Sequence, residues 1–289
     1  MANGKKAALA ALKGVGVFAG YFVLQNIVSA VGLIKLGAEQ ARNNPGKVAD
    51  PAETTKLAMD FITENSCWFI LIAAAVTLLI MFITSLIRKK RFSGMTGMEK
   101  TSPKNALAGA MIGLGTAPVV LTVLSLLPDS VMNNYTQTSS VLGGGTLLGT
   151  ILGTVIAAPV IEEVICRGLI FRGMRKHASL IPSVIVSSVI FALAHSLSGF
   201  SIVWVTYAFV LGVILAIVCE KTGSIIPTIC LHIAFNLFGT VISSLIAPYM
   251  GTALTVIVTV AGAALIAAGF FLLRKKNAVS NAIKFETAD

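Results

Sequence analysis

Residues 159–172 have the sequence PVIEEVICRGLIFR, which places two adjacent acids, Glu162 and Glu163, and a base, Arg167, in an apolar, helix-length stretch. Inserting one such charge into a bilayer costs about 2.5–3.5 kcal/mol on insertion scales. A membrane sequence keeps charged groups where they pair with each other, line a wet cavity or take part in chemistry. The role of this stretch therefore depends on which other polar residues lie near it.

The composition predicts a membrane protein. Of 289 residues, 56% are hydrophobic and only 12% are charged, and the mean hydropathy is +0.88. Apolar runs of about 18 residues or more recur, and each is long enough to cross a bilayer of about 30 Å as a helix. We therefore expect an all-α fold, a polytopic transmembrane helical bundle. No Gly/Ser-rich or Pro-rich linker divides it into two integral domains.

About eight spans are expected, at about 14–34, 66–87, 105–127, 147–171, 180–197, 202–219, 224–246 and 252–273. Basic clusters at 88–91, 172–176 and 274–276 then share one side, which the positive-inside rule makes cytoplasmic, with both termini inside. The net charge of +10 is thus accounted for by membrane topology. The sequence has no basic stripe with interleaved aromatic residues, so nucleic-acid binding is not expected. The first apolar run resembles a secretory signal, but it extends far enough to be an uncleaved span.

Polar residues of three spans are expected at one depth. Glu163 and Arg167 are four residues apart, so they share a helix face and can pair, which leaves Glu162 for other work, although the two acids could exchange roles. At about 1.5 Å per residue, Glu162 lies roughly 15 Å and His232 roughly 14 Å from the basic side. His195 ends the fifth span opposite Glu162, and Asn236 follows His232 by four residues.

Each of these residues also has a structural explanation. The acids and the arginine could form an ion-pair lock between helices, and an intramembrane histidine often serves as a hydrogen-bond donor. Asn236 could hold two helices together, and Phe191 is expected in the core. Such explanations require the shared depth to be accidental.

The residues form three motifs in order along the chain: Glu162-Glu163-x-x-x-Arg167, Phe191-x-x-x-His195 and His232-x-x-x-Asn236. The set resembles the motifs of the CAAX-processing and bacteriocin-processing (CPBP, or Abi) intramembrane proteases, which include type II prenyl-protein endopeptidases. The resemblance covers roughly residues 145–245. It divides the chain into an N-terminal transmembrane region (1–144), a protease core (145–245), and a last span with a cytoplasmic tail (246–289).

The resemblance implies an intramembrane endopeptidase that cleaves a peptide bond near the cytoplasmic face. Glu162 would activate water, His195 would help to hold it, and His232 with Asn236 would stabilise the oxyanion. Donors fixed in a low-dielectric cavity act more strongly on a developing negative charge than they do in water. Glu163 and Arg167 belong to the same catalytic set.

Metal dependence is open at this point. Glu162, His195 and His232 could form a three-ligand zinc site with an open position. A metal-free glutamate mechanism would use the same residues, and the sequence contains no H-E-x-x-H motif. We therefore favour a mechanism without a cofactor and keep zinc as the alternative.

Two other classes compete with the protease. A non-catalytic bacteriocin-immunity or scaffold protein could keep the same residues for binding. A secondary transporter could use them as an ion site, but the paired broken helices expected for that class are not evident. The expected partners are a peptide or protein substrate and the lipid bilayer, and the expected location is a bacterial plasma membrane. Substrate identity and oligomeric state are not indicated.

Overall fold

The computed structural model describes residues 2–45, 50–132, 145–198 and 200–273, and within these ranges the regular structure is entirely helical. In these described ranges, seven helices are long and apolar enough to span a membrane. They are α1 (Ala2–Asn43), α2 (Pro51–Ile87), α4 (Pro103–Ser125), the helix Leu147–Arg175, α10 (Ile202–Thr222), the helix Ile226–Tyr249, and α13 (Thr252–Leu272). The expected all-α membrane bundle is confirmed.

The count of eight spans depends on α9 (Leu180–His195). This helix is apolar but has only 16 residues, or about 24 Å at 1.5 Å per residue. It is the shortest of the apolar helices expected to cross the membrane, and it ends at His195. The expected basic cluster at 274–276 lies outside the described residues.

Large apolar side chains remain exposed on the outside of the bundle. Phe271 is 83% exposed, Leu126 78% and Ile87 76%. Extensive apolar surface of this kind marks contact with a membrane or with another protein. Together with the spanning helices, it makes this a multi-pass membrane protein.

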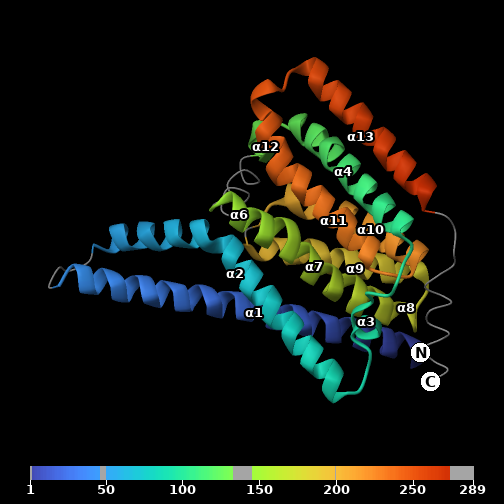
Figure 1. Ribbon diagram of the computed structural model, residues 1–289, viewed down its shortest axis with the longest axis horizontal. Coiled ribbons are helices and arrows are strands. Elements are labelled where there is room, and N and C mark those ends of the chain that lie inside the picture. The colour runs from blue at the N-terminus through green and yellow to red at the C-terminus, as the bar shows by residue number, and fades with distance from the viewer. Residues whose placement is uncertain (1, 46–49, 133–144, 199, 274–289) are drawn as a thin grey trace.

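The first two helices are longer than a membrane requires. α1 has 42 residues and α2 has 37, whereas about 20 residues cross the hydrocarbon core. Figure 1 shows the two as a hairpin that projects away from the other helices. The side chain of Asp50 accepts a hydrogen bond from the Ala52 N–H, and Pro51 opens α2. The polar segment expected outside the membrane is therefore helical on both arms.

Glycines let α4 approach two other helices closely. A Cβ on Gly109 or Gly113 would collide with the backbone carbonyls of Pro227 or Leu231 in α11 (Ile226–Asn236), and one on Gly115 would meet the Gly262 carbonyl in α13. Small residues at such contacts are typical of membrane helix packing. α4 thus lies between α11 and α13, as Figure 1 shows, and it fixes the helix that carries His232.

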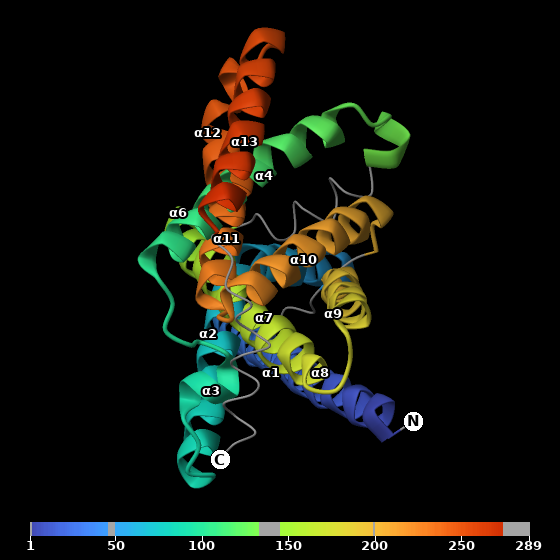
Figure 2. The same cartoon turned by 90° about the vertical axis from the view of Figure 1, so that its right-hand side faces the viewer.

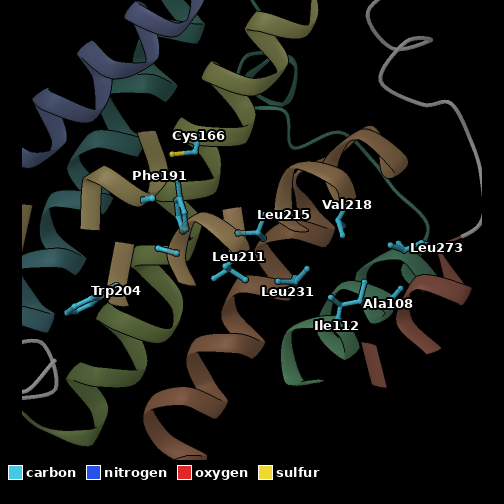
Figure 3. Close-up of a cluster of buried hydrophobic side chains, with 12 residues drawn as sticks. Ala108, Ile112, Cys166, Phe191, Trp204, Leu211, Leu215, Val218, Leu231 and Leu273 are labelled. Carbon is cyan, nitrogen blue, oxygen red and sulfur yellow. The ribbon is translucent and has the colours of Figure 1, made fainter. Parts of the chain in front are cut away.

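A second packing layer joins α9, α10 and α11. α10 packs against α9 along its length and also contacts α11, and Figure 2 shows the three helices from the side. Their apolar residues form the cluster drawn in Figure 3, in which Phe191, Leu215 and Leu231 are fully buried. Cys166, one turn after Glu162, belongs to the same cluster. The helix with the two acids is therefore anchored in the main core.

Candidate active site

The acids lie in a helix with irregular winding. The span Leu147–Arg175 runs through α6 (Leu147–Gly149), η1 (Thr150–Ala157), α7 (Ala158–Glu163), η2 (Val164–Phe171) and α8 (Arg172–Arg175), of which η1 and η2 are π-helical. π-helical turns are uncommon and often lie at functional sites. Glu162 and Glu163 close the short α-helical segment between the two. No feature of the sequence predicted this change of winding.

Behind the acids lies a buried ion pair. Arg167 Nη1 donates to Glu163 Oε1 at 2.9 Å, and both side chains are fully buried. Arg167 Nη2 donates to the Gly212 carbonyl of α10 at 3.0 Å. The pair expected from the four-residue spacing therefore forms, and it also links two helices. Charged groups without solvent need such partners, because an unpaired buried charge costs several kcal/mol.

His232 joins this pair to the second acid. Its Nδ1 lies 3.2 Å from Glu163 Oε1, and its Nε2 lies 3.7 Å from Glu162 Oε2. The Glu163 carboxylate, ionised beside Arg167, can only accept hydrogen bonds, so Nδ1 of His232 carries the proton and donates it. This contact fixes the ring and directs Nε2 toward Glu162. Orientation of a histidine by a carboxylate on its other nitrogen is a recurrent arrangement in catalytic sites.

Four of the six expected site residues line one cavity of about 660 Å³: Glu162, His195, His232 and Asn236. Glu162 is 18% exposed at its side chain, whereas the adjacent Glu163 is fully buried. The 3.7 Å between Glu162 Oε2 and His232 Nε2 is longer than a hydrogen bond. Both side chains line the cavity, and each can still bind a ligand there. The structure therefore gives the two acids different surroundings, one in the cavity and one behind it.

His195 and Asn236 are held by backbone carbonyls. His195 Nδ1 lies 2.8 Å from the Phe191 carbonyl, which can only accept, so Nδ1 donates and Nε2 is the unprotonated nitrogen of the neutral ring. Asn236 Nδ2 donates to the Thr154 carbonyl in η1 at 2.9 Å. One hydrogen of that amide is thus used, and the second remains for another acceptor.

Phe191 has a larger part in the site than the sequence indicated. It was expected only as a core residue, and it is fully buried. Its ring stands 4.4 Å from the Arg167 guanidinium carbon, and it contacts the rings of His195 and His232 edge-on at 4.6 and 5.5 Å between centroids. The Phe191 ring therefore packs against three polar residues of the site, Arg167, His195 and His232. Its place four residues before His195 was the available signal.

The residues do not form a metal site as arranged. Among the described residues, no three His, Cys, Asp or Glu side chains are grouped closely enough to hold a metal ion. The donors named for zinc, Glu162, His195 and His232, include one close pair at 3.7 Å. The third, His195, makes a hydrogen bond to the Phe191 carbonyl at 2.8 Å. No step in the mechanism below is therefore routed through a metal.

Comparison with known proteins identified a family over one part of the chain. Residues 144–238 match the model described as type II CAAX prenyl endopeptidase Rce1-like. A search of curated proteins and a search of solved structures each found no match. The matched region holds all three motifs, and the family indicates protease activity. The match over residues 144–238 thus confirms the resemblance seen in the motifs, and this part of the chain is similar to the type II CAAX prenyl endopeptidase Rce1-like family.

Proposed function

We propose that this protein is an intramembrane endopeptidase that uses Glu162 to activate water for attack on a peptide bond. One observation carries the proposal: Glu162, His195, His232 and Asn236, from three separate helices, line the same cavity. An ion-pair lock would account for Glu163, Arg167 and the His232 contact with Glu163, but not for Glu162, His195 and Asn236 in the cavity wall. The family match over residues 144–238 supports the same reaction class.

In the proposed reaction, a water molecule lies between Glu162 and His195. Glu162 accepts a proton while the water oxygen bonds to the carbonyl carbon of the substrate. His195 contributes its unprotonated Nε2 to hold the water, because its Nδ1 donates to the Phe191 carbonyl. When the carbon–nitrogen bond breaks, Glu162 returns the proton to the leaving amine. Proton transfer of this kind contributes about 10²–10⁴-fold to the rate.

The oxyanion formed in the first step would be stabilised by His232 and Asn236. For this role in the proposed reaction, His232 must carry a proton on each ring nitrogen. The Nε2–H then donates to the oxyanion while Nδ1–H remains on Glu163, 3.2 Å away. Asn236 offers the amide hydrogen that Thr154 does not use. Such preorganised donors act most strongly where water is excluded.

The proposal is tested by incubating the purified protein in liposomes with a library of apolar peptides. Cleavage should be lost in Glu162→Gln and His195→Ala and retained in Glu220→Gln, the matched control at a glutamate outside the cavity. Each variant must keep the elution volume and unfolding midpoint of the original protein. Cleavage that persists in Glu162→Gln would refute the assignment of the base.

Two further measurements separate the competing mechanisms. A chelator should leave cleavage unchanged, because the proposed base acts on water directly, whereas loss and recovery with added zinc would favour the metal alternative. Solute uptake by vesicles that depends on Glu162, without cleavage, would favour a transporter. Peptide maturation, bacteriocin immunity and CAAX-type processing in a bacterial plasma membrane stay predictions.

A further inference from the structure

The cavity occupies one half of the bundle. Along α4 it is lined only by residues from Ala117 to Leu124, the second half of that helix, and along α10 only by residues from Trp204 to Leu211, the first half. α4 and α10 run in opposite directions, so these halves lie at one end. In the acid-bearing helix the lining residues stop at Glu162, and in α11 they begin at His232. Glu162 and His232 therefore form the floor of the cavity.

The basic residues occupy the opposite end. α1 begins near Lys5 and Lys6 and lines the cavity only from residue 18 onward, while α10 reaches Lys221 after its cavity-lining half has ended. Arg88–Arg91 follow α2, whose single lining residue is Ile70. On α10 and on the helix Leu147–Arg175 the basic end and the cavity-lining residues are at opposite ends. On α1, which also has Arg42 in its last turn, and on α2 the lining residues lie in the middle of the helix.

Direct contacts show that the basic ends share one level. Arg175 pairs with Glu220 at 2.8 Å across α8 and α10. Ser224 Oγ donates to the Glu99 carbonyl at 2.6 Å, and the Ile225 N–H donates to the Gly97 carbonyl at 3.0 Å. These bonds hold the loop after α2, the end of the acid-bearing helix and the turn before α11 together as one face.

Apolar packing closes the route from that face to Glu162. Beneath the cavity floor lies a cluster of buried residues that includes Val164, Phe171, Ala216, Cys219 and Ile225. All five are at most 1% exposed. Protein interiors packed in this way leave no passage for a peptide.

We infer that the active-site cavity opens on the extracytoplasmic half of the membrane, and that the enzyme takes an apolar peptide segment presented from that side. Basic loops remain in the cytoplasm by the positive-inside rule, so the end without them faces outward. The inference rests on the proposed protease function for its substrate, but not for its geometry. It departs from the sequence expectation of cleavage near the cytoplasmic face.

The walls of the cavity indicate the substrate. Aromatic and aliphatic side chains form most of the upper lining, among them Phe18, Phe22, Val120, Leu121 and Phe235. Threonine hydroxyls and the Asn236 amide supply scattered polar contacts. An extended, mostly apolar segment, such as the outer end of a membrane-spanning peptide, would bury its side chains there and reach the acid at the floor.

The test labels single cysteines with a membrane-impermeant maleimide in intact cells and, separately, in lysed membranes. The Cys230→Ala variant gives the background, because Cys67, Cys166 and Cys219 are buried and Cys230 is only half-buried. Gln25 and Ser244, on two different helices, line the cavity at its open end, away from the floor. The variants Gln25→Cys and Ser244→Cys should label fully in intact cells. The matched basic-end positions Lys90→Cys and Lys221→Cys, both exposed, should label only after lysis. The reverse pattern would overturn the inference.

A second arm connects the opening to the substrate. Maleimide attached at Ser244→Cys should block cleavage of the apolar peptide, whereas the same reagent attached at Lys221→Cys should not. Blocking from Lys221→Cys alone would also overturn the inference. The two proposals fail separately: unchanged cleavage in Glu162→Gln removes the protease assignment and leaves the labelling pattern intact. Labelling of the basic end in intact cells removes the outward opening and leaves the dependence on Glu162 intact.

Discussion

The two sides of α7 put neighbouring acids into different environments. Glu162 faces a cavity and has a partially exposed carboxylate that lies 3.7 Å from His232 Nε2. Glu163 faces the interior, where Arg167 Nη1 at 2.9 Å and His232 Nδ1 at 3.2 Å both contact one of its oxygens. One carboxylate is available to a substrate, and the other is committed to the protein.

One helix thus carries a residue proposed for catalysis next to a residue that stabilises the fold. A group that transfers protons must reach the reacting atoms, and its removal should change the rate more than the fold. A buried ion pair is costly to break, because one charge is left without a partner. His232 connects the two sides, so the interior pair can influence catalysis through the orientation of that ring. Variants on each side should therefore separate activity from stability.

The largest effect is expected on the cavity side. Glu162→Gln should lower the cleavage rate about 10²–10⁴-fold, because the amide cannot accept the proton of water. At 1.36 kcal/mol per factor of ten, this corresponds to roughly 3–5 kcal/mol of transition-state stabilisation. Peptide cleavage and thermal unfolding of the same preparation measure both properties. A large drop in the unfolding midpoint would mean that Glu162 supports the fold instead.

On the interior side, Arg167→Met should destabilise the protein by about 3–5 kcal/mol, because Glu163 is left charged and buried. Met keeps much of the volume but loses the bonds to Glu163 and to the Gly212 carbonyl. Combining it with Glu163→Gln should recover part of this loss, as a double-mutant cycle in detergent would show. Additive losses in the double variant would contradict a coupled pair.

A smaller effect is expected where α4 meets α11. Gly113→Val places a side chain against the Leu231 carbonyl, the residue before His232. Overpacking of this kind costs about 1–3 kcal/mol, and it should move His232 relative to Glu162. We expect a lower unfolding midpoint and a reduced cleavage rate in the same variant. Gly4→Val, at a glycine with open space around it, is the control and should change neither.

The sequence predicted those parts of this arrangement that depend on local spacing. The apolar runs predicted the bundle, and four-residue spacing predicted that Arg167 reaches Glu163. The contact of His232 with Glu163 could not be predicted, because it depends on how closely α11 approaches α7 to within an ångström. That approach depends in turn on the glycine contacts of α4.

Other features had no sequence signal that we could use. The π-helical segments on either side of Glu162 have the sequences TILGTVIA and VICRGLIF, in which no residue marks a change of winding. The helical arms beyond the membrane, about 35–43 and 51–65, are polar and were expected only as an external segment with a turn. The direction in which the cavity opens requires all the lining helices to be placed together, and no single motif carries that information.

The smallest effect is expected at a second Glu–Arg pair, which tests whether burial explains the cost of breaking the first. Arg175 donates from Nε and Nη2 to the two oxygens of Glu220 at 3.0 and 2.8 Å, and the side chains are 15% and 21% exposed. Because water reaches both side chains and can replace part of the lost contact, Arg175→Gln should cost about 1 kcal/mol, less than Arg167→Met, and leave cleavage unchanged. Unfolding of Arg175→Gln beside Arg167→Met measures the contrast. If both substitutions cost the same free energy of unfolding, burial does not distinguish the interior pair. The role of Arg167 in the site would then depend on its bond to the Gly212 carbonyl and its stacking on Phe191.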